Sequence, residues 1–146
     1  MLAGDGRDVS TDFLDAFERH RSDADLLFGN ERWPNADQLY GFAAECGLKA
    51  VMQALGMRLR NDGGPKTRSY RVHIDRLWSE FHAFAAGRGA EPYAAMLPVE
   101  NPFSDWHTDQ RYYKSEAITE TSAVKHREAL ERVHRVVSRA RMDGRL

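Results

Sequence analysis

NADQLYGFAAECGLKAVMQALGMRL, from Asn35 to Leu59, carries apolar or small side chains almost all the way round a helical projection. A helix with this pattern is buried on several sides. Four of its polar side chains form one stripe at spacings of seven, four and four: Gln38, Glu45, Lys49 and Gln53. The sequence therefore predicts a central helix that begins after Asn35, a good N-cap residue, and around which the rest of the chain packs.

Three further segments have apolar residues at helical spacing, and none alternates like a strand. They run from about Val9 to Phe28, from Val72 to Ala86 and from Glu116 to Met142. A short helical turn is expected around residues 93–97. The predicted fold is all-α, an antiparallel bundle of four main helices plus a short fifth, because short or medium connections favour antiparallel neighbours.

The segment from Pro98 to Ser115 shows no regular pattern but is rich in aromatic residues. An aromatic-rich loop in a small domain is usually packed against the core. We therefore expect the following side chains to be packed down: Phe103, Trp106, Tyr112 and Tyr113.

The 146 residues are the size of one domain, spanning 1–146, and the formal net charge is only −1. This balance gives no overall field that would steer the protein onto nucleic acid or a membrane. The lone Cys46 excludes an internal disulfide and fits a reducing compartment. With no apolar leader and no apolar run of membrane-spanning length, a cytoplasmic protein without membrane contact is expected. The sequence holds no P-loop, GxGxxG or HExxH motif, so no cofactor and no metal are expected.

Charge is unevenly distributed along the chain. From Ser122 to Leu146, seven basic and three acidic side chains give +4, which leaves −5 for the rest. In this segment Arg127 and His134 are two helical turns apart and share one side of the helix. An arginine that binds phosphate and a histidine that moves a proton are what attack by a ribose 2′-OH requires. The alternative is a half-buried histidine beside an arginine that extends into water.

Two other places carry candidate ligand-binding residues. Glu45 and Lys49 are four apart on the central helix; an exposed pair of this kind is worth ~0.3–0.5 kcal/mol, and the sequence favours that interpretation over a buried polar feature. His73, preceded by an arginine five residues earlier, marks the start of the third helix. Arg111 and its neighbour Tyr112 lie in the aromatic-rich segment.

The region from Arg19 to Met52 resembles the first two helices of HEPN domains. That family has an Asp-Ala and a Leu pair late in its first helix, then a helix with an Ala-x-Glu-x-x-x-Lys-Ala pattern. The matching residues are Asp23-Ala24, Leu26-Leu27, Ala43-Ala44-Glu45 and Lys49-Ala50, with His73, Leu77 and Arg111-Tyr112 further on.

This resemblance implies an α-helical bundle that commonly forms a homodimer. Many HEPN members are metal-independent ribonucleases with an Arg-x4–6-His motif; others are inactive partners of nucleotidyltransferases, as in toxin–antitoxin pairs, or bind nucleotides. Arg127 and His134 have the motif's spacing but lie further along the last helix than in the family, and the Arg111-Tyr112 variant is typical of members without the nuclease histidine.

We therefore predict a HEPN-like module that binds a nucleotide, an RNA or a nucleotidyltransferase partner. The predicted ligand-binding residues are Glu45, Lys49, His73, Arg111 and Tyr112. One alternative is a ribonuclease that uses Arg127 and His134 as catalytic residues. The other is a structural interaction protein without a ligand.

Overall fold

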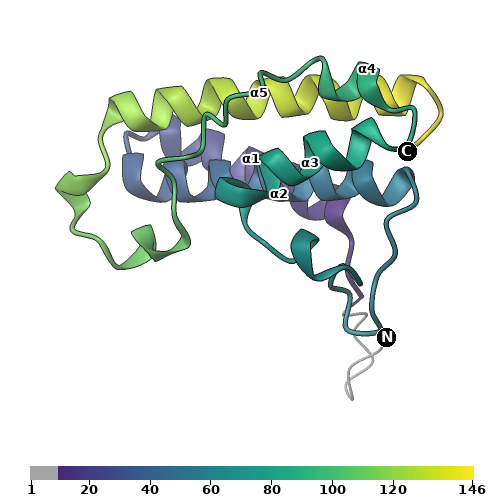
Figure 1. The fold of residues 1–146 in the computed structure, drawn as a ribbon. Helices are drawn as coiled ribbons and strands as arrows, with labels where there is room; N and C mark the ends of the chain where they lie inside the picture. The colour runs from purple at the N-terminus through teal and green to yellow at the C-terminus, as the bar shows by residue number, and fades with distance from the viewer. Residues whose placement is uncertain (1–9) are drawn as a thin grey trace.

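The computed structural model describes residues 10–146, and these form an all-helical bundle (Figure 1). Four helices are long and one is short, which confirms the predicted fold class. The α-helices are α1 (Phe13–Gly29), α2 (Trp33–Ala54), α3 (Ile74–Ala86), α4 (Glu91–Ala94) and α5 (Glu120–Met142). Three 3₁₀ turns lie between them: η1 (Arg68–Tyr70), η2 (Thr108–Tyr112) and η3 (Ser115–Ala117).

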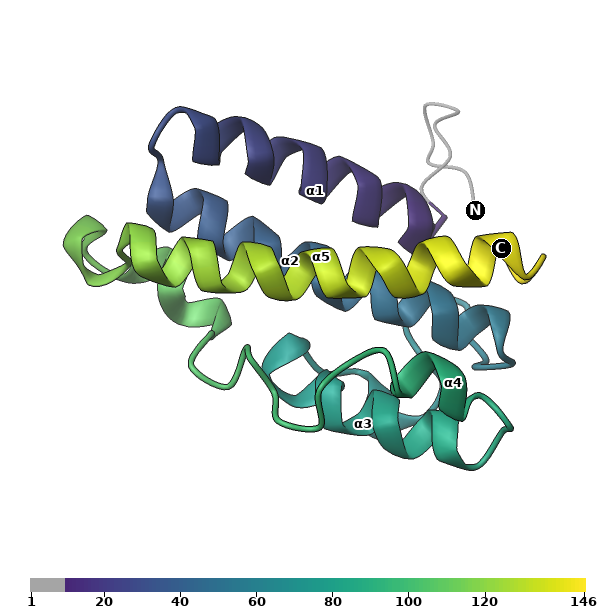
Figure 2. The same cartoon turned by 90° about the horizontal axis from the view of Figure 1, so that it is seen from above.

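Helix α2 lies in the middle, with α1 on one side and α3 on the other (Figure 2). A short turn makes α1 and α2 antiparallel, as expected. Helix α5 instead runs in the same direction as α2, since Asp37 meets His126 near the start of both helices and Gly47 meets Val133 further along. The long connection 55–119 allows this arrangement, because it returns the chain to the beginning of α2.

The helix boundaries differ from the predicted ones for local reasons. Helix α1 begins at Phe13, because the Asp12 side chain caps it by accepting from the Asp15 N–H at 3.0 Å; the predicted start at Val9 lies outside the described residues. Helix α2 begins before Asn35, which is not its N-cap, since Pro34 sits in the first turn where its missing N–H is not needed. It ends at Ala54, before Gly56 with φ of 108°.

The remaining helices are slightly displaced from their predicted positions. Helix α5 begins after Thr119, whose hydroxyl caps it, rather than at Glu116, which belongs to η3. The short helix α4 begins two residues before the predicted turn at 93–97 and ends within it, with a proline in its first turn. Helix α3 starts two residues after Val72, with His73 as its N-cap.

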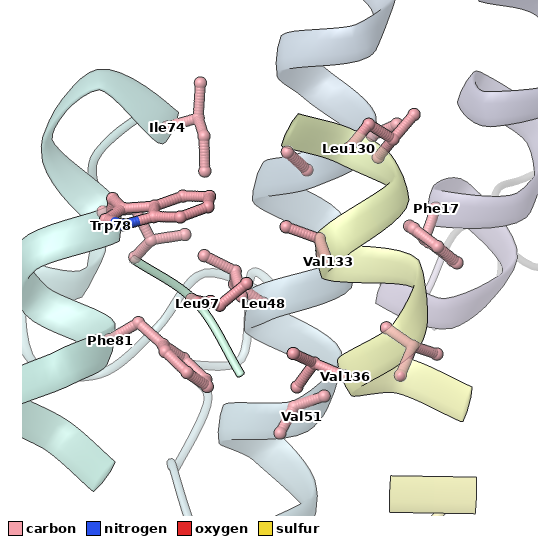
Figure 3. Close-up of a cluster of buried hydrophobic side chains, with 14 of the residues drawn as sticks. Phe17, Leu48, Val51, Ile74, Trp78, Phe81, Leu97, Leu130, Val133 and Val136 are labelled. Atoms are coloured by element: carbon pink, nitrogen blue, oxygen red, sulfur yellow. The ribbon is translucent and has the colours of Figure 1, made fainter. Parts of the chain in front are cut away.

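The core forms where α2 and α5 meet α1 on one side and α3 on the other (Figure 3). Phe17 reaches it from α1, Leu48 from α2, Val133 from α5 and Trp78 from α3, all with at most 1% of their surface exposed. The prediction that Asn35–Leu59 forms the central helix is thus confirmed for residues up to Ala54. No helix within residues 10–146 is long and apolar enough to cross a membrane.

The aromatic-rich segment 98–115 is packed down along only part of its length. Phe103 and Trp106 are buried, as predicted, and the Trp78 indole donates to the Pro98 carbonyl at 2.8 Å. Tyr112 and Tyr113 are exposed, so the prediction is wrong for them. Tyr112 ends the turn η2 and Tyr113 follows it, whereas the buried Gln110 anchors the turn on its other side.

Candidate functional site

Glu45, Lys49 and His73 form one hydrogen-bonded cluster between α2 and the start of α3. One carboxylate oxygen of Glu45 lies 2.8 Å from Lys49 Nζ, and the other lies 2.8 Å from His73 Nδ1. The side chains of Glu45 and Lys49 are only 14% and 7% exposed. The exposed-pair interpretation is therefore wrong, because other parts of the fold cover these two side chains, which the helix alone would leave open.

The electrostatics of this cluster favour its charged form. Burial by itself raises the pKa of Glu45, but the bonds from His73 and Lys49 outweigh it and hold that pKa below its ordinary value. The hydrogen bond that the His73 ring donates to Glu45 raises the pKa of His73. Phe42 and Trp106 lie edge-on to the His73 ring at 6.0 and 6.4 Å. The sequence-predicted Glu45, Lys49 and His73 are thus brought together, with their charges satisfied by one another.

Lys49→Ala is expected to lower the free energy of unfolding by about 1–2 kcal/mol, more than a surface pair contributes. The substitution leaves the mostly buried Glu45 carboxylate with a single partner, His73. Urea denaturation of the wild type and the variant measures the difference. Lys125→Ala removes an exposed pair with Asp105 and serves as the matched control, with an expected effect of a few tenths of a kcal/mol. Equal effects of the two variants would contradict the structural importance of the buried pair.

Arg111 and Tyr112 lie apart from this cluster. The Arg111 guanidinium stacks over the Tyr112 ring at 4.5 Å and donates to the Thr108 carbonyl at 3.1 Å. Both side chains are exposed on η2. Within residues 10–146 no hydrogen bond, ion pair or ring contact joins either residue to Glu45, Lys49 or His73. The five predicted ligand-binding residues therefore do not form a single site.

Arg127 lines a hollow on the outer side of α5. Its guanidinium lies over the Phe28 ring at 4.6 Å, and its Nε is 3.6 Å from an Asp25 carboxylate oxygen, so α1 holds it in place. The hollow has a volume of about 620 Å³. Its walls come from one helix: Val124, Arg127, Glu128, Glu131, Arg132 and Arg135.

His134 faces a different pocket. Its ring stacks on Phe17 at 6.0 Å, and it lines a pocket of about 220 Å³ between α1 and α5. Glu131 lies between this pocket and the hollow at Arg127, whose lining it joins. An ion pair with Arg21 at 3.2 Å holds the Glu131 carboxylate in this position. The two residues share a helix face, as the periodicity predicts, but the structure does not bring them to one common pocket.

Sequence reasoning missed a buried network centred on His126. Its Nδ1 lies 2.5 Å from an Asp37 carboxylate oxygen and its Nε2 lies 2.8 Å from Asp105, while the ring stacks on Phe103 at 5.0 Å. His126 is 1% exposed and Asp37 is fully buried. Burial alone lowers the pKa of His126, but the bonds to the two carboxylates outweigh it and raise that pKa. The network joins α2, α5 and the segment 98–115.

A signal for this network was present in the sequence. Asp37 is a carboxylate in a helix that is otherwise apolar nearly all round, and His126 falls close to the apolar seam of α5. A buried carboxylate requires a partner, and a seam histidine can supply one. Nothing in the sequence, however, indicates that residues 89 positions apart meet.

Neither a cysteine nucleophile nor a metal site has support in the described part of the chain. Burial raises the pKa of the Cys46 thiol to about 12, which makes it a poor nucleophile. Among residues 10–146 no group of three or more His, Cys, Asp or Glu side chains is arranged to hold a metal ion.

Comparison with known proteins finds no matching family model, no matching curated protein and no matching solved structure. The resemblance to HEPN domains therefore depends on the quoted residues alone.

Proposed function

We propose that this chain is a HEPN-like module that binds RNA through the outer face of α5. One observation carries the proposal: Arg132 and Arg135, both exposed, have no acidic partner within residues 10–146. The other cations of α5 are paired, as in Lys125 with Asp105 and Arg141 with an acidic residue of α1. Unpaired arginines on an exposed helix are free to contact phosphates.

The neighbourhood of these arginines favours an extended anion over a small one. Together with Arg127 they supply three positive charges to the hollow, against two from Glu128 and Glu131. A net charge of this size gives weak attraction to a single phosphate. An RNA strand can contact several arginines along the helix, and each contact releases counterions.

The geometry favours binding over cleavage. A base and a phosphate-binding cation must act on the same phosphodiester. Arg127 and His134 are about 10 Å apart along the helix axis and face separate hollows, with the Glu131 carboxylate between them. The ribonuclease alternative would need a second copy of the chain to complete each site.

The proposal also includes protein partners, namely a second copy of the chain or a nucleotidyltransferase. The resemblance to HEPN domains implies a homodimer, and the largely apolar α2 and the three tryptophans are the features that would favour one. Within one chain, α1, α3 and α5 already cover α2, and Trp78 and Trp106 are buried. The apolar surface that motivated the dimer is thus accounted for inside a single copy. A homodimer, or a complex with a nucleotidyltransferase, would have to use other surfaces, such as the exposed Leu26 on α1.

Titration of a fluorescent single-stranded RNA at low salt tests the proposal. The double variant Arg132→Gln/Arg135→Gln is expected to bind about tenfold more weakly than the wild type, since two charge-assisted phosphate contacts are lost. Arg76→Gln is the matched control, because Arg76 is an exposed arginine of α3 that lies outside the α5 hollow.

Three outcomes would contradict the proposal. Equal weakening by the control variant would show that binding is not located on α5, and absence of binding would favour a structural interaction protein. Cleavage of the RNA in EDTA that is lost in His134→Ala would favour the ribonuclease alternative instead.

A further inference from the structure

The pocket at His134 lies between α1 and the C-terminal half of α5. Two buried apolar side chains, Phe17 and Val137, contribute to its lining. The polar side chains around it come from both helices: Glu18 and Arg21 from α1, and His134, Ser138 and Arg141 from α5. Cationic and hydroxyl donors therefore surround a partly apolar floor.

The two arginines are held in place without using all their donors. Arg21 donates to Glu131 through Nε and Nη2, both at 3.3 Å, and Arg141 donates to Glu18 through Nη2 at 2.8 Å. A guanidinium has five N–H groups, so each arginine keeps donors for another acceptor. The Ser138 hydroxyl has no hydrogen-bond partner within residues 10–146. The carboxylates thus position the arginines, both of which line the pocket and keep further N–H donors.

The size of the pocket limits its ligand. The pocket has a volume of about 220 Å³. This is enough for one tetrahedral oxyanion with some water and less than the 300–1,000 Å³ usual for larger organic ligands. A phosphate group fits, whereas a whole nucleotide would extend outside.

We propose that this pocket binds a phosphate group, held by Arg21 and Arg141 from two different helices together with Ser138 and His134. The site is separate from the α5 hollow proposed to bind RNA, because Glu131 lies between the two. It therefore does not depend on RNA binding, and inorganic phosphate is a sufficient probe.

Phosphate binding in this pocket is coupled to the protonation of His134 through the balance of charges around it. The positive charges of Arg21 and Arg141 are offset by Glu131 and Glu18, so a phosphate dianion gains most when His134 is also protonated. Burial, followed by the charges of Arg21 and Arg141, lowers the pKa of His134, while Glu131 and Glu18 act in the opposite direction. A bound anion opposes the effect of the arginines and raises this pKa. By reciprocity, phosphate binds more tightly to the protonated protein by the same factor.

Titration of the His134 ring by NMR tests the proposal, with sodium phosphate compared with sodium chloride at equal ionic strength. Phosphate is expected to raise the pKa of His134 by about one unit, which corresponds to about tenfold tighter binding to the protonated form. His107, whose exposed ring does not line the pocket, reports any general effect of the salt within the same spectra.

Two variants locate the effect. Arg141→Gln is expected to abolish the phosphate-dependent shift, and Ser138→Ala, which removes one hydroxyl, to reduce it. Arg139→Gln is the matched control on the same helix, since Arg139 does not line the pocket, and it should keep the full shift. Identical His134 titrations in phosphate and chloride would overturn the proposal. So would a wild-type shift that persists in both Arg141→Gln and Ser138→Ala.

Discussion

Asp37→Ala is expected to lower the free energy of unfolding by about 3–5 kcal/mol, the largest effect of any single substitution considered for this protein. The Asp37 carboxylate is fully buried and accepts from the Gln110 amide at 2.9 Å as well as from the His126 ring. Its removal leaves the His126 ring and the Gln110 amide buried without this acceptor. Urea denaturation at pH 6 measures the loss.

Asp105→Ala is the matched control for this prediction. Asp105 bonds the other nitrogen of the same ring, but its side chain is 51% exposed, so water can replace it. We expect a loss of about 1 kcal/mol. If Asp37→Ala cost no more than Asp105→Ala, the network would not depend on the buried carboxylate.

The pH dependence of stability follows from the direction of the His126 shift. Because the folded-state pKa of His126 is raised, its contribution is fully present below the unfolded value of about 6.5. The contribution is lost as the pH rises through the folded-state pKa. The wild type should therefore lose stability on the alkaline side of this range, through His126.

Gly41→Ala is expected to have the second largest effect, a loss of about 2–3 kcal/mol. A methyl group on Gly41 would overlap the Trp106 ring, which is 1% exposed and donates to the Asp37 carbonyl at 3.1 Å. Since the ring is buried, the segment 98–115 would have to shift away from α2 to make room for the methyl group.

Thermal unfolding of Gly41→Ala beside Gly29→Ala measures this effect. Gly29 is the last residue of α1, and a methyl group there meets no atom within 4 Å. The control should be neutral or slightly stabilising, because alanine favours a helix more than glycine does. Similar melting temperatures for the two variants would show that the close approach of Trp106 to α2 does not contribute to stability.

The fold class could be predicted because the apolar periodicity of each long helix is a local property of the sequence. Helix α2 shows this most clearly: a pattern that is apolar nearly all round requires neighbours on several sides, and α1, α3 and α5 supply them. The exact helix ends depend on single residues, such as Asp12 at the start of α1 and Gly56 after α2. Several neighbouring residues could cap or end each helix, so the sequence does not single out one of them.

The candidate sites could be predicted less well, since they depend on contacts between distant segments. Periodicity placed Arg127 and His134 on one face of α5. It could not show that, on α1, Phe28 contacts Arg127 while Phe17 contacts His134, so that the two residues lie against different parts of α1. Lys49 is a similar case, because its burial depends on how the rest of the fold covers one side of α2.

The central claim is that the arginines on the outer face of α5 bind the phosphates of RNA. The dependence of the RNA association constant on salt concentration tests it most directly, since the logarithmic slope counts the phosphates that are neutralised. Three arginines in the α5 hollow predict a slope of about −2 for the wild type, and about −0.7 for Arg132→Gln/Arg135→Gln, in which one remains. A slope near zero for the wild type, or the same slope for both proteins, would contradict the claim.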